Sequence, residues 1–137
     1  ELGRTKGGNP NSYDAGDRVN RFDWAAAPRF APTTAFVRAL IALRRAHPSL
    51  RLESADAVRR HLAFVPEERL PPRTVAFVVR GVPGEPWGEV LVALHGGTAP
   101  ATLALPPGAW RVALDERGAG RAESVRGSLA LAPLGAV

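Results

Sequence analysis

The chain has 137 residues, enough for one domain with a hydrophobic core, and 45% of them are hydrophobic. No run of about 18 apolar residues occurs, which excludes a membrane-spanning helix, and the absence of cysteine excludes disulfides and thiolate metal sites. The formal net charge is +5, but the cations are almost all scattered arginines without interleaved aromatic residues, so we do not expect nucleic-acid binding.

Residues 9–24, NPNSYDAGDRVNRFDW, place polar and aromatic side chains between glycine and proline breakers. The stretch has neither a helical nor an alternating apolar period, so it predicts an ordered loop. Amides, carboxylates and an arginine beside an aromatic ring also suit a sugar-binding groove, because they form paired hydrogen bonds with hydroxyls. From the residues alone, a structural loop and a ligand-binding loop both stay open. We expect Trp24 to pack rather than to contact sugar.

The segment from Pro32 to about His47 has the clearest helical period. Its apolar stripe consists of Phe36, Leu40, Leu43 and His47, widened by Val37 and Ile41. Thr33 or Thr34 is expected to cap the helix. Pro48 ends it, because a proline disfavours the helical conformation of the residue before it.

Beyond Ser54, which is expected to cap one or two helical turns, the pattern changes to short apolar runs separated by glycine- and proline-rich turns. These runs cover residues 62–65, 74–80, 89–95, 102–105, 110–115 and 129–131. Short strands at this spacing predict an all-β sandwich or barrel. The change of pattern places a domain boundary near residues 50–54.

Single tryptophans and histidines are ambiguous in this part of the chain. Trp87 lies in a loop and is expected to tuck against the sheet edge, with sugar stacking as the alternative, whereas Trp110 begins a strand and is expected in the core. Three histidines lie far apart without the spacing of metal ligands: His47, His61 and His95. We expect each to be a surface or capping residue, and we expect no metal site.

Several motifs follow one another in a fixed order: Arg4-Thr5-Lys6-Gly7-Gly8, Asn11-Ser12-Tyr13, Gly16-Asp17-Arg18-Val19-Asn20 and Phe22-Asp23-Trp24. Together with LIALRRAHPSL at residues 40–50, they resemble the segment after the eighth barrel strand of type I pullulanases. These are debranching enzymes of the α-amylase superfamily, glycoside hydrolase family thirteen. Isoamylase and glycogen-debranching relatives stay open as alternatives, but the Asn11-Ser12-Tyr13 and Val19-Asn20 motifs favour pullulanase.

The resemblance implies a particular fold. Residues 1–52 would be the last loop and helix of a (β/α)₈ barrel, and residues 53–137 would form a C-terminal antiparallel β-sandwich, so the fold class is mainly β. The Phe36-Leu40-Leu43 face would pack on barrel strands that this chain lacks, which predicts an exposed apolar face. The chain starts at Glu1 and has no methionine, so we expect a processed chain or a fragment.

The resemblance also implies a function. The parent enzyme would hydrolyse α-1,6-glucosidic linkages in pullulan, starch or glycogen limit dextrins with retention. Such hydrolysis needs a carboxylate pair about 5–5.5 Å apart, and the family takes its catalytic carboxylates from earlier strands. We therefore expect no catalytic residue here, no cofactor, and no activity of this chain alone.

Carried over residue by residue, the resemblance assigns four substrate-binding candidates: Asn11, Tyr13, Asp17 and Asn20. Arg4 is expected to hold the loop by pairing with a carboxylate. The sandwich would be a structural cap. The alternative is a non-catalytic carbohydrate-binding β-sandwich module that uses Trp87, and a third interpretation is a purely structural domain without glucan affinity.

Overall fold

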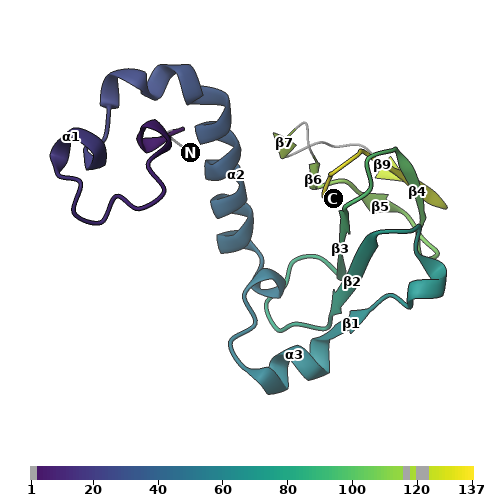
Figure 1. Cartoon of the computed structure of the whole chain (residues 1–137). Helices are drawn as coiled ribbons and strands as arrows, with labels where there is room; N and C mark the ends of the chain where they lie inside the picture. Colours follow the sequence, from purple (N-terminus) through teal and green to yellow (C-terminus); the bar gives the residue numbers. More distant parts are fainter. Residues whose placement is uncertain (1–2, 116–117, 120–123) are drawn as a thin grey trace. The chain divides into compact units, whose positions relative to one another are not determined.

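The computed structural model describes residues 3–115, 118–119 and 124–137, and the chain divides into two compact units, Glu1–Ile41 and Ala42–Val137 (Figure 1). The α-helices are α1 (Asp17–Asn20), α2 (Ala31–Ala46) and α3 (Ala55–His61), and short 3-10 helices cover Lys6–Gly8, Trp24–Phe30, Pro48–Leu50 and Glu67–Arg69. The longer strands are β1 (Leu62–Phe64), β2 (Thr74–Arg80), β3 (Glu89–His95), β4 (Ala101–Ala104) and β9 (Ser128–Leu131). Four two-residue strands lie between β4 and β9: β5 (Trp110–Arg111), β6 (Leu114–Asp115), β7 (Gly118–Ala119) and β8 (Ser124–Val125).

Helix α2 confirms the predicted helix but not its predicted cap. Asp23 accepts a hydrogen bond from the backbone of Ala25 at 3.1 Å and begins the 3-10 helix, which runs directly into α2. Neither Thr33 nor Thr34 caps the helix, because the backbone before them is already helical. No residue of α2 is buried, and Ile41 is 52% exposed.

Trp24, expected to pack, is 70% exposed. Its ring contacts Phe22, with ring centroids 5.6 Å apart, and Phe22 is itself 53% exposed. Among the described residues of the first unit, only Ser12 is buried. Residues 3–41 thus contain no hydrophobic core into which a large indole could be placed, and the packing prediction is wrong for Trp24.

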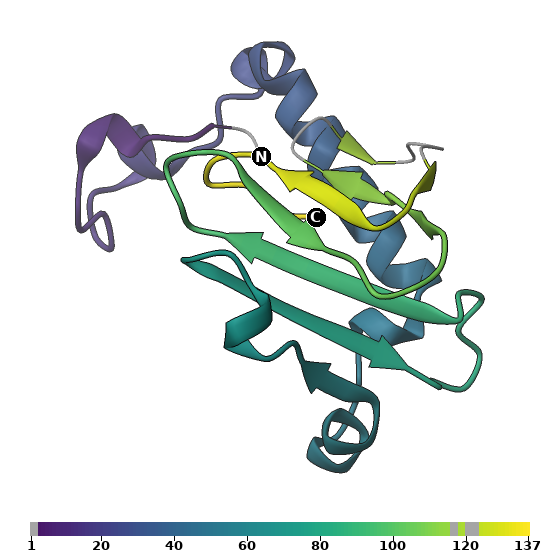
Figure 2. The ribbon, with the colours of Figure 1, turned by 90° about the vertical axis from the view of Figure 1, so that its right-hand side faces the viewer.

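The second unit is organised on an antiparallel sheet in the order β1-β2-β3. Ser54 caps α3 as predicted, because its Oγ accepts from the backbone of Ala57 at 3.1 Å. Figure 2 shows the long strands β2 and β3 side by side, in a register that pairs Ala76 with Ala93. The C-terminal segment adds to the free edge of β3, where Ala93 and Val137 exchange backbone hydrogen bonds of 2.6 and 2.9 Å.

The core of this unit lies between the β2–β3 ribbon and the antiparallel pair β4–β9. Ala76, Ala93, Leu103 and Leu131 form one buried cluster, with a residue from each of the four strands. Alternation of buried and exposed positions along β2 and β3 places their small side chains toward β4 and β9. The expected antiparallel β-structure is confirmed, although the run predicted over residues 110–115 is divided into β5 and β6.

The opposite face of the β1-β2-β3 sheet carries exposed apolar side chains. Val75 and Leu94 are cross-strand partners and are 50% and 49% exposed. Phe64, 67% exposed, lies opposite Phe77 with the two rings edge to face at 6.0 Å. Val75, Leu94 and Phe64 form what we call the outer apolar face. Separately, no helix within the described part of the chain has the length and hydrophobicity needed to cross a membrane.

Candidate functional site

The loop of residues 9–24 is ordered around Ser12, which is buried. Lys6 Nζ lies 2.5 Å from Ser12 Oγ, and Asn20 Nδ2 donates to the Ser12 carbonyl at 2.7 Å. Arg4 in turn donates to the Asn20 carbonyl at 2.5 Å. These bonds join three segments of the chain, so the loop has a defined shape despite having no apolar core of its own.

The four candidate residues divide into two kinds. Tyr13 is 95% exposed, and Asn11 and Asp17 are exposed as well. Asn11 Oδ1 accepts weakly from the backbone of Tyr13 at 3.4 Å, and Asp17 is the first residue of α1. Asn20, in contrast, directs its amide into the loop. Three of the candidates thus face solvent, whereas Asn20 holds the turn that carries them.

Arg4 holds the loop, but not through the expected carboxylate. Its guanidinium donates to the Asn20 carbonyl and lies 4.7 Å from the ring centroid of Phe22. Phe22 contacts Trp24, so Arg4, Phe22 and Trp24 form a continuous row. The predicted partner of Arg4, a carboxylate, is wrong. The Asn20 carbonyl and the face of the Phe22 ring take its place.

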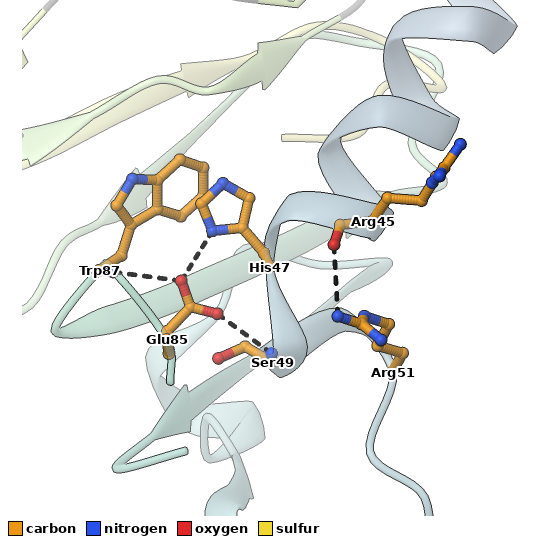
Figure 3. A network of polar contacts seen from close by, with 6 residues as sticks. All are labelled: Arg45, His47, Ser49, Arg51, Glu85 and Trp87. Atoms are coloured by element: carbon orange, nitrogen blue, oxygen red, sulfur yellow. Dashed lines mark hydrogen bonds and ion pairs between the residues drawn. The ribbon is translucent and has the colours of Figure 1, made fainter. Parts of the chain in front are cut away.

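A second polar cluster lies in the β-sheet unit, around Glu85 in the β2–β3 loop (Figure 3). Glu85 Oε1 is 2.7 Å from His47 Nδ1 and accepts from the backbone of Trp87 at 3.1 Å, while Oε2 accepts from the backbone of Ser49 at 3.1 Å. The side chains of His47 and Glu85 are only 8% and 4% exposed. The Trp87 indole stacks on the His47 ring, with centroids 3.5 Å apart and the planes at 28°.

The electrostatics of Glu85 follow from this arrangement. Burial of the carboxylate raises its pKa, but hydrogen bonds from His47, Ser49 and Trp87 more than offset that effect and lower the pKa from 4.5 to about 2. Glu85 is therefore ionised at all ordinary pH values. A carboxylate held in this state by three donors cannot act as a general acid near neutral pH.

The histidines correct another sequence expectation, since His47 and His95 are buried rather than on the surface. His47 leaves the helical conformation before Pro48, as predicted, and turns into the Glu85 cluster. His95 joins Thr74 Oγ1 at 2.9 Å and the Ala99 carbonyl at 3.0 Å. Within residues 3–115, 118–119 and 124–137, no group of three or more His, Asp or Glu side chains could hold a metal ion.

The two later tryptophans match the sequence only in part. Trp87 packs as expected, with the His47 ring as its partner. Trp110 is half-buried rather than in the core, and its Nε1–H donates to the Pro106 carbonyl at 3.0 Å. No pattern in the sequence predicts the Glu85 cluster itself, in which His47 and Glu85 are 38 positions apart. The only local signals are a His-Pro pair at a helix end and a Glu two residues before a loop tryptophan.

Comparison with known proteins shows that the chain is similar to pullulanases. A family model described as pullulanase, all-beta domain, matches residues 58–118. A pullulanase from Bacillus subtilis (strain 168) is 45% identical over 62 residues, which cover 45% of this chain and 9% of that protein. Residues 58–118, which the family model matches, include the whole β1-β2-β3 sheet and its loops.

Solved structures extend the likeness to nearly the whole chain. A pullulanase from Bacillus acidopullulyticus superimposes with a TM-score of 0.89 and 32% identity, covering 98% of this chain and 17% of that one. A pullulanase from Anoxybacillus sp. LM18-11, complexed with maltotetraose, gives a TM-score of 0.83 and 31% identity over 97% of this chain and 19% of that one. The chain thus spans less than a fifth of these relatives. The resemblance to pullulanases that the motifs predict is confirmed, and the chain is similar to one part of these pullulanases.

Proposed function

We propose that this chain is the C-terminal portion of a pullulanase-type glycoside hydrolase that acts on α-1,6-glucosidic linkages in pullulan, starch or glycogen limit dextrins. Residues 1–52 supply the last loop and helix of the catalytic (β/α)₈ barrel, and residues 53–137 form the C-terminal β-sandwich. The catalytic carboxylates lie elsewhere in the parent enzyme, so this chain alone is inactive. Glucan binding by the parent is supported by solved relatives complexed with maltotetraose and maltotriose.

The observation that carries the proposal is the contrast between Ser12 and Tyr13. Ser12 is 7% exposed and fixed by Lys6 and Asn20, whereas the adjacent Tyr13 is 95% exposed. Burying an aromatic ring in a core stabilises a protein by several kcal/mol. Because the Tyr13 ring is almost fully exposed, it does not contribute in this way to the stability of the loop. This favours a binding role for Tyr13, stacked on the apolar face of a glucose unit.

The other candidates take supporting roles in the same model. Asn11 and Asp17 lie on either side of Tyr13 in the sequence and are exposed, so their amide and carboxylate can form hydrogen bonds with sugar hydroxyls. Asn20 acts indirectly, because its Nδ2 is already committed to the Ser12 carbonyl at 2.7 Å. The loop therefore offers a ring and two polar groups to a glucan.

The β-sheet unit is proposed as a structural cap. Its outer apolar face, Phe64, Val75 and Leu94, is between 49% and 67% exposed, and Leu40 and Ile41 of α2 are 36% and 52% exposed. Contiguous apolar surfaces of this kind are typical of interfaces rather than of free solvent-facing sheets. Barrel elements of the parent enzyme are the proposed cover for both surfaces.

The experiment is a titration of the ¹³C,¹⁵N-labelled chain with maltotetraose and with a branched α-1,6-containing oligosaccharide. Tyr13 is the only tyrosine, so its ring resonances report on the loop without ambiguity. The proposal predicts shifts confined to residues 9–24. Shifts centred on Trp87 would favour the carbohydrate-binding module, and no shift at millimolar ligand would favour a purely structural domain.

A further inference from the structure

We infer that His47, Ser49, Glu85 and Trp87 form an interdomain clip. In it, Glu85 ties the segment that follows α2 to the β2–β3 loop and keeps a proton on His47 Nδ1. The four residues are hereafter the Glu85 clip. Its description as interdomain rests on the proposed function, since residues 1–52 and 53–137 are the proposed domains. The contacts themselves lie within the compact unit that begins at Ala42.

Glu85 is the centre of the clip because both of its oxygens accept hydrogen bonds, and Oε1 accepts from both segments. Oε2 accepts from Ser49 and Oε1 accepts from His47, two residues of the segment that follows α2. Oε1 also accepts from Trp87 within its own loop. A single carboxylate thus joins the segment that follows α2 to the β2–β3 loop. Glu85 is 36 positions from Ser49 and 38 positions from His47 in the sequence. Hydrogen bonds to a charged acceptor are about twice as strong as neutral ones.

The tautomer follows from the inventory of donors. An ionised carboxylate can only accept hydrogen bonds, so the His47 nitrogen that lies 2.7 Å from Glu85 Oε1 must carry the proton. That nitrogen is Nδ1, and it carries a proton in both the neutral Nδ1–H tautomer and the charged imidazolium. The contact is therefore retained whether His47 is neutral or protonated.

The clip also determines what Trp87 can do. One face of its indole is covered by the His47 ring at a centroid separation of 3.5 Å, and its backbone N–H is bonded to Glu85. A ring that packs on a buried histidine is a structural element rather than an open sugar platform. Glu85 is thus a positioning residue for Trp87, and the β2–β3 loop is shaped by contact with the helix end.

The first test needs no variant. One-bond ¹H–¹⁵N correlations of the imidazole rings at neutral pH identify which His47 nitrogen carries the proton. The clip predicts a proton on Nδ1. A neutral Nε2–H tautomer would overturn the inference, because Nδ1 would then have no proton to give to Glu85. This result is independent of any sugar, so it can fail while the proposed function stands.

The second test compares two matched substitutions. Glu85→Gln changes the clip, and Glu89→Gln makes the same chemical change at the exposed Arg80–Glu89 ion pair, where the side chains are 55% and 40% exposed. Amide hydrogen exchange at Ser49 and Trp87 should accelerate about tenfold in the first variant and stay unchanged in the second. Equal protection in both variants would refute the clip. If Glu85→Gln does not fold, the tautomer measurement decides alone.

Discussion

Replacing Glu85 by glutamine should lower the stability of the β-sheet unit by an amount that the pKa of Glu85 sets. The carboxyl has a pKa of about 2 in the folded chain against 4.5 in the absence of its partners. This difference corresponds to about 3 kcal/mol at neutral pH, since one pKa unit is about 1.36 kcal/mol. For a chain of this size the expected decrease in Tm is about 10 °C.

The geometry explains why an amide cannot substitute. Glu85 Oε1 faces two donors, His47 and Trp87, and Oε2 faces a third, Ser49. An amide has one oxygen and one NH₂ group, so either orientation places N–H against a backbone N–H of Trp87 or Ser49. A buried donor left without an acceptor costs about 1–3 kcal/mol, which agrees with the value from the pKa.

The pH dependence gives the sharper assay. Because the pKa of Glu85 is lowered by folding, its contribution is fully present above pH 4.5 and is lost as the pH falls through about 2. Urea unfolding of wild type and Glu85→Gln, followed by circular dichroism, should therefore differ most at neutral pH and converge in acid. Glu89→Gln serves as control and should change stability by less than about 1 kcal/mol. A Glu85→Gln deficit that is equal at pH 7 and pH 2.5 would refute the reasoning.

Three further substitutions and one control, Gly96→Ala, test the fold. Gly97→Ala would place a Cβ 2.5 Å from Cε1 and Nε2 of the His95 ring, which is held at both nitrogens, so it should cost about 1–3 kcal/mol in urea unfolding. The neighbouring Gly96→Ala, whose nearest contact is an ordinary 3.6 Å, should change little, and equal costs would contradict the clash. Arg73→Gly should raise stability by about 0.5 kcal/mol, because Arg73 is strained at φ 61°; an unchanged or lower Tm would count against this. Ser54→Ala removes the α3 cap and should cost about 1 kcal/mol, and a cost near zero would show that the cap is dispensable.

Local pattern was sufficient for much of the β-sheet unit. Strands β2 and β3 were predicted with their observed bounds, because alternating valines between glycine- and proline-rich turns allow few other structures. Ser54 was recognisable as a cap because its partner lies only three residues ahead. These features depend on neighbours in sequence, and sequence reasoning handles such features well.

Features set by distant partners were not predictable in the same way. His47 has a polar partner at Glu85, 38 positions away, and no spacing rule connects the two. Trp24 was expected to pack, but burial depends on a core that the described residues of the first unit do not provide. The four candidate loop residues come from family resemblance, and only the structure separates exposed Tyr13 from inward-facing Asn20.

The most direct test of the account is the affinity of the chain for maltotetraose with two aromatic substitutions compared side by side. Tyr13→Ala removes the exposed ring, whereas Trp87→Phe keeps a ring to stack on His47. The account predicts that Tyr13→Ala weakens binding about tenfold, or about 1.4 kcal/mol, and that Trp87→Phe leaves it unchanged. Binding that survives Tyr13→Ala but is lost in Trp87→Phe would contradict the account and identify the β2–β3 loop as the sugar-binding site.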